Sequence, residues 1–260
     1  MKKFLILIMC TILFLVGCNN IEYNEKSEGK RNQDIIIKDS EDTNKNSIEE
    51  HIEDPITIVI DPGHSSVGNP QKEQVAPNSS ETKAKDVLGA TGNYTNIPEY
   101  ETNLSVSLLL KKELEDRGYN VVMTKTKVNE SLSNIERANI GNENNANLVI
   151  RMHADSNDDT SISGASMQVP ANNEYTSSFY DISKKYGEII INNYATELNL
   201  KNRGLVYRGD LTGFNWSKVP VVLLEMGYLS NKQDDEFVSD TMNHEKIAKS
   251  IANGLDKCFK

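Results

Sequence analysis

The chain has 260 residues, of which 37% are hydrophobic and 25% are charged, and its formal net charge is −10 at pH 7. This composition excludes a collagen-like, mucin-like or wholly disordered chain. The acidic balance argues against a nucleic-acid partner, because phosphate backbones would be repelled. The three cysteines, Cys10, Cys18 and Cys258, are too few for a disulfide framework or a structural thiolate zinc site.

Residues 1–17 have the features of an export signal: Lys2 and Lys3 are followed by an uninterrupted run that is almost wholly apolar. The run is short for a membrane-spanning helix. It ends in LVGC at residues 15–18, which resembles a bacterial lipobox and implies cleavage before Cys18 and lipidation of its thiol. We therefore expect an extracytoplasmic protein that is lipid-anchored to the bacterial cell membrane and faces the cell wall. The alternative is a plain signal anchor with an incidental cysteine.

Residues 18–54 are rich in Asn, Lys, Glu, Asp and Ser and keep no helical or strand periodicity. Too little apolar surface is present to offset the entropy of ordering the chain, so this segment is expected to be a disordered tether. A flexible chain of this length reaches about 30–36 Å. Such a tether would let an anchored domain reach material near the membrane.

From Pro55 onward, hydrophobic periodicity predicts strands that alternate with helices. This order predicts an α/β fold for residues 55–260: a single catalytic domain with a twisted, mostly parallel central sheet and helices on both faces. The expected elements are a strand over 56–60, a helix over 104–117, a strand over 119–124, a helix over 131–146, strands over 147–152 and 165–169, a helix over 177–198, a strand over 219–224 and a helix over 243–259.

Ionisable residues follow three of these strands: His64 comes after the strand over 56–60, His153 after the strand over 147–152, and Glu225 after the strand over 219–224. If the three strands are parallel, their carboxyl ends meet at one edge of the sheet, where ligands bind in such folds. A lone histidine there is more typical of a hydrogen-bonded turn. Burying an unpaired carboxylate costs several kcal/mol, so Glu225 is harder to explain without a functional role. Two imidazoles and a carboxylate suit zinc, although spacing alone establishes no site.

Six segments together resemble a known family in their order along residues 55–260. The segments are IVIDPGH at 58–64, EYETNL at 99–104, YNVVMT at 119–124, ERAN at 136–139, IRMHAD at 150–155 and VVLLEMGYLSN at 221–231. Each segment alone is weak evidence, but the ordered set resembles the zinc-dependent N-acetylmuramoyl-L-alanine amidases of the type-3 class.

The resemblance implies one Zn²⁺ ion held by His, Glu and His. His64 matches the first ligand and His153 the last. Glu99 is the expected middle ligand because it lies five positions before Leu104, and Glu101 is the alternative. Glu225 matches the family's catalytic glutamate.

The implied activity is peptidoglycan hydrolysis at the amide between N-acetylmuramic acid and L-alanine of the stem peptide. Zinc would activate a water molecule, and Glu225 would accept its proton and later protonate the leaving nitrogen. The alternatives are another zinc-dependent envelope peptidase and a non-catalytic lipoprotein that binds wall fragments. We expect a monomer, and the sequence names no protein regulator.

Some polar residues keep two interpretations each. The long segment 65–98 departs from the family pattern and is either a loop over the site that shapes substrate choice or a surface excursion. Asp61 and Asp155 are expected either to orient the ligand imidazoles or to cap turns. Arg137 is expected to form a buried structural ion pair.

Overall fold

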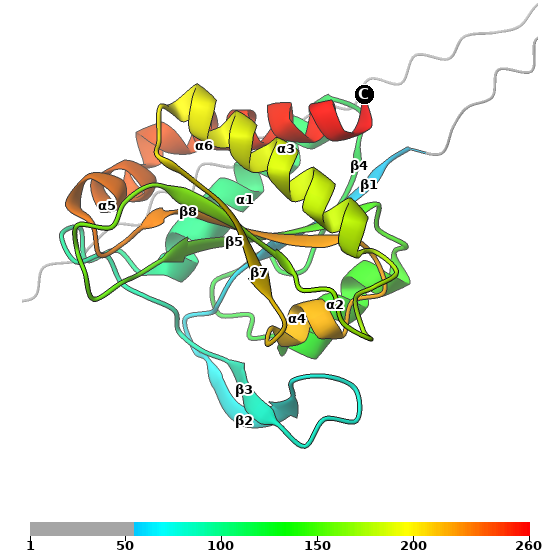
Figure 1. The fold of residues 1–260 in the computed structure, drawn as a ribbon. Helices are drawn as coiled ribbons and strands as arrows, with labels where there is room; N and C mark the ends of the chain where they lie inside the picture. The colour runs from blue at the N-terminus through cyan, green and yellow to red at the C-terminus, as the bar shows by residue number, and fades with distance from the viewer. Residues whose placement is uncertain (1–54) are drawn as a thin grey trace, which may run out of the picture. The chain divides into compact units, whose positions relative to one another are not determined.

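Six strands form the central sheet in the order β4-β1-β5-β8-β6-β7 in the computed structural model, which describes residues 55–260 (Figure 1). β4, β1, β5 and β8 run parallel, β6 is antiparallel to β8, and β7 is parallel to β6. The strands are β1 (Thr57–Pro62), β4 (Asn120–Met123), β5 (Leu148–Asp155), β6 (Ala165–Pro170), β7 (Asn202–Arg208) and β8 (Val221–Tyr228). The predicted α/β fold with a mostly parallel sheet is confirmed, while the predicted signal and tether lie outside the described residues.

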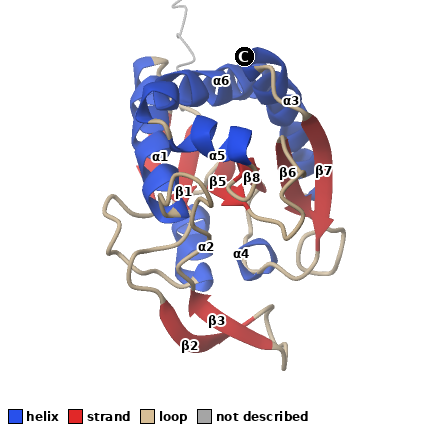
Figure 2. Ribbon diagram, turned by 90° about the vertical axis from the view of Figure 1, so that its left-hand side faces the viewer, coloured by secondary structure: helices blue, strands red, loops and turns tan. Residues whose placement is uncertain are grey.

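Successive side chains of each strand point to opposite faces of the sheet, and both faces are covered. Ile58 and Ile60 belong to the larger apolar core, whereas Val59 packs with Phe214 in a smaller one. The helices are α1 (Glu99–Asp116), α2 (Asn134–Glu143), α3 (Tyr180–Leu198), α4 (Thr212–Asn215), α5 (Lys232–Ser239) and α6 (Thr241–Phe259). Figure 2 shows α1, α6 and α3 on one side of the sheet and α2 and α4 on the other.

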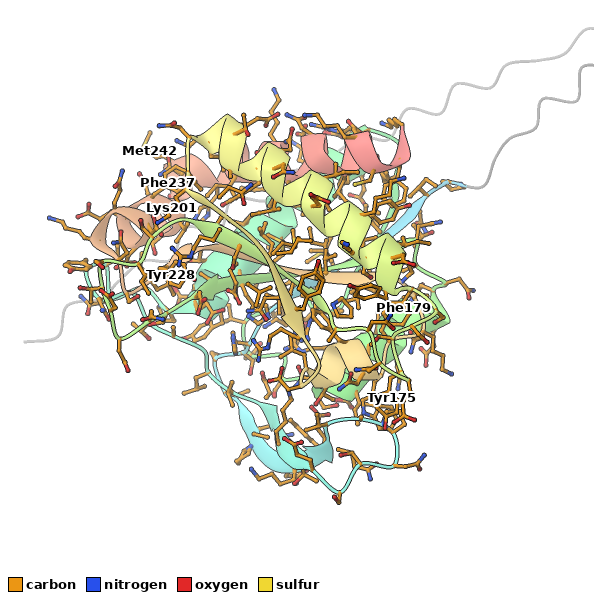
Figure 3. All side chains as sticks on the ribbon, viewed as in Figure 1. Tyr175, Phe179, Lys201, Tyr228, Phe237 and Met242 are labelled. Carbon is orange, nitrogen blue, oxygen red and sulfur yellow. The ribbon has the colours of Figure 1, made fainter. Side chains whose placement is uncertain are left out.

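The carboxyl ends of β1, β5 and β8 lie side by side because these neighbouring strands are parallel. Figure 2 looks onto this edge, and in Figure 3 Tyr228 marks the carboxyl end of β8. β5 and β8 continue past their predicted ends, so His153 and Glu225 are strand residues that pair in register rather than residues of the following loops.

Helix α1 begins at Glu99, five residues before the predicted start at Leu104. Its first turn is polar, so the apolar pattern becomes visible only from Leu104 onward. Three further elements, β7, α4 and α5, have no counterpart among the elements that the sequence predicts. β7 is largely exposed, α4 has four residues, and α5 begins with an acidic turn, so none has a strong hydrophobic period.

The segment 65–98 contains an antiparallel hairpin of β2 (Asn69–Gln74) and β3 (Thr82–Asp86), which projects below the sheet in Figure 1. Its strands are polar, which is why no strand pattern was visible in the sequence. The hairpin is joined to α2 through Glu73, whose carboxylate accepts hydrogen bonds from the backbone nitrogens of Asn134 at 3.0 Å and Ile135 at 3.2 Å. Amides in the first turn of a helix have no carbonyl partner within the helix, and a carboxylate is favoured beside them.

Within residues 55–260, no helix combines the length and the apolar character that a bilayer crossing requires.

Candidate metal centre and catalytic site

His64, Glu99 and His153 lie together at the carboxyl edge of the sheet, with potential ligand atoms all within 4.8 Å of one another. Oε1 of Glu99 is 3.3 Å from Nε2 of His64 and 3.1 Å from Nδ1 of His153. The two imidazole rings meet edge to face, with centroids 4.8 Å apart. Residues from β5, α1 and the turn after β1 thus converge on one point.

The turn after β1 holds His64 in an uncommon backbone conformation, with φ at +61°. Non-glycine residues rarely adopt positive φ, and such strain is often found at functional sites. Nδ1 of His64 lies 2.9 Å from the carbonyl oxygen of Val87. Because a carbonyl oxygen can only accept, Nδ1 carries the hydrogen in a neutral ring, and the lone pair is on Nε2, which faces Glu99.

Glu99 is buried in the first turn of α1 with 3% of its surface exposed. Its Oε1 accepts hydrogen bonds from the backbone nitrogen of Ala154 and from Nδ2 of Asn103, both at 3.1 Å. Its Oε2 accepts from the backbone nitrogen of Ala90 at 2.9 Å. Burial favours the protonated form, but the hydrogen bonds and charges of His153 and His64 outweigh it and hold the pKa of Glu99 well below its usual range.

Glu101 shares the first turn of α1 with Glu99 but is exposed and does not belong to the His64–Glu99–His153 group. Two residues along a helix correspond to about 200° of rotation, so the two carboxylates point in nearly opposite directions. A carboxylate in the first turn of a helix interacts favourably with the helix dipole, and this stabilising role is the one that the position of Glu101 supports.

The three side chains fit a zinc ion by their chemistry and their spacing. Zinc binds His nitrogen and carboxylate oxygen at about 2.0–2.1 Å, and two ligands of one tetrahedral ion are then about 3.3 Å apart. The observed separations of 3.3 and 3.1 Å agree with that value. A lone pair on Nε2 of His64 directed at a carboxylate oxygen is unfavourable unless a cation or a proton lies between them.

His153 is held in a neutral form by its surroundings. Desolvation by burial lowers the pKa of His153 to about 4. Its Nε2 is buried without a hydrogen-bond partner among residues 55–260. The ring lies against Gly63, where any side chain would collide with it, so this glycine is required by close approach. A neutral imidazole is the form that binds a metal ion.

Glu225 lies opposite His153 in the β5–β8 register and is also buried. Its Oε1 accepts a hydrogen bond from Nε2 of Gln168 at 2.8 Å, and Oε2 has no partner among the described residues. Burial, with the nearby charges of Glu99 and Asp155, raises the pKa of Glu225 well above its usual range. The side chain is therefore oriented through one oxygen and suited to take up a proton on the other.

Gln168 was not singled out from the sequence. It lies on β6, and its Oε1 accepts a hydrogen bond from Nη1 of Arg208 at 3.0 Å. This bond fixes the amide orientation, so that its nitrogen faces Glu225. Nothing in the pattern around residue 168 distinguishes it, because its proximity to Glu225 depends on the antiparallel pairing of β6 with β8.

Asp61 does not contact either ligand imidazole, which corrects one of its two predicted roles. Its carboxylate is 2.7 Å from Nη1 of Arg137 and 2.7 Å from Nε of Arg151, and it accepts a hydrogen bond from Thr124. Asp61 is fully buried, and burial raises its pKa, but the two guanidinium groups outweigh that effect and leave the pKa far below the usual range. The expected buried ion pair of Arg137 is confirmed. Asp155 is the last residue of β5, and its carboxylate accepts a hydrogen bond from the backbone nitrogen of Ser156.

His244 is buried at the start of α6. Its Nε2 donates to the carbonyl oxygen of Val238 at 2.9 Å, and its Nδ1 accepts from the hydroxyl of Ser105 at 2.8 Å. Both ring nitrogens are satisfied, so His244 connects α6 to α1 and lies outside the His64–Glu99–His153 group.

A cavity of about 270 Å³ adjoins the site between the sheet and the hairpin. His64 and His153 form one wall, and residues of β3 form another. The remaining lining residues are Val87, Asn134, Arg137, Arg151, Leu211 and Leu223. The site therefore opens onto a concave surface that could receive part of a substrate.

The sequence matches the family described as N-acetylmuramoyl-L-alanine amidase (Amidase_3) over residues 58–257. The chain belongs to this family. A curated relative, "Probable cell wall amidase LytH" of Staphylococcus epidermidis, is 26% identical over 203 residues, which are 78% of this chain and 58% of that protein. The uncharacterized protein YqiI of Bacillus subtilis is 27% identical over 173 residues, which are 66% of this chain and 78% of that protein.

Solved structures with the same fold include the N-acetylmuramyl-L-alanine amidase Ami1 of Mycobacterium abscessus, with a TM-score of 0.71 and 22% identity. The similarity covers 79% of this chain and 99% of that structure. An N-acetylmuramoyl-L-alanine amidase of Clostridium difficile has a TM-score of 0.64 and 18% identity over 79% of this chain and 97% of the other. At these identities, the similarity establishes the fold.

Proposed function

We propose that this protein is a zinc-dependent N-acetylmuramoyl-L-alanine amidase that hydrolyses peptidoglycan. The observation that carries the proposal is the combination of the His64–Glu99–His153 group with Glu225, whose free oxygen lies at the same edge of the sheet. Membership of the amidase family supports the assignment of the substrate.

Zinc held by His64, Glu99 and His153 would supply a Lewis acid that lowers the pKa of water towards about 7 and polarises a carbonyl group. Glu225 would accept the proton of the attacking water on Oε2. The bond between the lactyl carbonyl carbon and the alanine nitrogen would break, and Glu225 would give that proton to the nitrogen. Gln168 would keep Glu225 oriented during both transfers.

The surrounding residues would hold the site for this chemistry. The carbonyl of Val87 orients the ring of His64, and the amides of Ala90 and Ala154 hold the carboxylate of Glu99 in place. The buried Asp61 connects Arg137 to Arg151 and thereby joins α2 to the central strands below the site. His64, which follows β1, and His153, which lies on β5, are therefore held by rigid elements.

Removal of the metal is the direct test of this function. Purified peptidoglycan should be solubilised by the zinc-loaded protein and not by the chelated protein, and added zinc should restore the activity. Mass spectrometry of the fragments should find free lactyl groups on muramic acid together with new N-terminal alanine. Fragments cut within the stem peptide would instead show a peptidase, and binding without any new ends would show a wall-fragment-binding protein.

We further propose that Cys18 is lipidated and that residues 18–54 tether the domain to the outer face of the membrane, where it acts as a monomer on the wall. The support is the LVGC sequence at 15–18 and the polar composition that follows it. Lipid chains contribute about 0.8 kcal/mol per buried methylene, so several chains on one residue hold a protein firmly.

Replacing this cysteine tests the anchor. Cys18→Ala should release the protein into the medium or leave the signal uncleaved, as measured by membrane fractionation and by the mass of the mature chain. Cys10→Ala is the matched control, because Cys10 lies inside the apolar run, and this variant should remain anchored. Normal processing and anchoring of Cys18→Ala would exclude lipidation at that residue.

A further inference from the structure

The cavity beside the proposed zinc ligands has a cationic group that forms no salt bridge with a carboxylate of residues 55–260. Lys83, on β3 of the hairpin, lines this cavity together with Arg137, Arg151, His64 and His153. Its ammonium group carries three donors. Within residues 55–260 it makes one hydrogen bond, to the carbonyl oxygen of Asp210 at 3.3 Å.

The other charges at the cavity are already paired. Arg137 and Arg151 share the carboxylate of Asp61, each at 2.7 Å. Asp86 lines the cavity as well, but it is buried and accepts hydrogen bonds from the hydroxyls of Ser65 and Ser131. These contacts leave Lys83 as the group in the cavity that could bind an added anion.

The carboxylates nearest to Lys83 from neighbouring elements have partners of their own. The Asp210 carboxylate accepts two hydrogen bonds from Arg208, at 2.8 and 2.7 Å. Glu73, opposite Lys83 in the hairpin register, is bonded to the N-terminus of α2. Burial, with the positive charge of Arg151, lowers the pKa of Lys83, so an anion in the cavity would be stabilised electrostatically.

We propose that Lys83 and the cavity beside it bind a free carboxylate on the stem peptide, next to the L-alanine that is released. This inference rests on the proposed amidase function. The lactyl carboxyl group is consumed in the amide that is cut, so a negative charge close to that bond has to come from the stem peptide. Its second residue is a glutamate joined through the γ-carboxyl group, and its α-carboxyl group is either free or amidated.

The walls of the cavity fit a short peptide better than a sugar. Ala84, Val87, Leu211 and Leu223 provide apolar surface around the charged groups. The volume of about 270 Å³ is below the usual range of about 300–1,000 Å³ for whole small-molecule ligands, so it suits one or two residues of a larger substrate. Lys83 thus becomes a specificity-determining residue on the β2–β3 hairpin.

A pair of substrates that differ in one group tests the proposal. Muramoyl peptides with either free α-carboxyl glutamate or its α-amide at the second position should be cleaved with different KM values, the acid being preferred about 10- to 100-fold. This range corresponds to one hydrogen bond to a charged group. Lys83→Gln should remove the preference, because it should raise the KM of the free-acid substrate and leave the KM of the amide substrate and both kcat values nearly unchanged. Lys72→Gln removes the same charge from the exposed side of the hairpin and should keep the preference.

Binding to the chelated protein provides a second measurement that does not depend on turnover. The dipeptide L-alanyl-γ-D-glutamate should perturb the NMR signals of residues around the cavity, and a titration gives its Kd. The Kd should be at least about tenfold higher for the α-amide of the dipeptide, and also for the acid with the Lys83→Gln variant. Equal binding of both dipeptides, or equal cleavage of both substrates by the wild type, would overturn the proposal and leave the amidase function standing. Lys83-dependent binding without cleavage of either substrate would overturn the amidase function and leave the carboxylate site standing.

Discussion

Glu225→Gln should lower the turnover of peptidoglycan by about 10²–10⁴-fold, which is the usual contribution of a general acid–base. Glutamine keeps nearly the same size and can still pair with Gln168, whose Nε2 now contacts Oε1 at 2.8 Å. It cannot accept a proton from the attacking water. The variant should therefore fold, retain zinc and bind wall fragments, as measured by circular dichroism, metal analysis and a pull-down with insoluble peptidoglycan.

Glu101→Gln is the matched control for this experiment, since it removes a carboxylate from an exposed position of the same domain. Its activity should remain within about twofold of the wild type. Full activity of a zinc-loaded Glu225→Gln protein would show that another residue is the base. Loss of zinc from that variant would instead identify Glu225 as a ligand.

Replacing a metal ligand should produce the second large effect. His64→Ala or His153→Ala removes one of three proposed ligands, and zinc affinity should fall by more than the 10–100-fold that loss of an outer hydrogen-bond partner usually costs. Activity at limiting zinc should fall in parallel. Competitive titration with a zinc-binding dye measures the affinity, and high zinc should partly rescue the activity.

The two glutamates of the first turn of α1 give an internal control for the ligand set. Glu99→Gln should lower zinc affinity as the histidine variants do, because its carboxylate lies between the two imidazoles. Glu101→Gln should leave zinc affinity unchanged. The opposite pattern for Glu99 and Glu101 would move the site by two residues along α1 and would also contradict the geometry described here.

The charged network below the site explains why the sequence predicted some roles better than others. The buried ion pair of Arg137 was predictable because a guanidinium in a core helix needs a carboxylate. The two arginine partners of Asp61 were not predictable, because Asp61 is 76 residues from Arg137 and 90 from Arg151 in the chain. The same holds for Gln168, which is 57 residues from Glu225.

The amino-acid sequence by itself determined the alternation of strands and helices and the position of His64, His153 and Glu225 near the ends of buried strands. These features depend on local periodicity and on one general property of parallel sheets, so they can be read along the chain. Only the tertiary structure decided that Glu99 lies between the imidazoles, that Gln168 orients Glu225, and that a polar hairpin brings Lys83 to the same cavity. These relations are contacts between elements far apart in sequence, and they depend on strand order, strand direction and helix rotation, which no local pattern encodes.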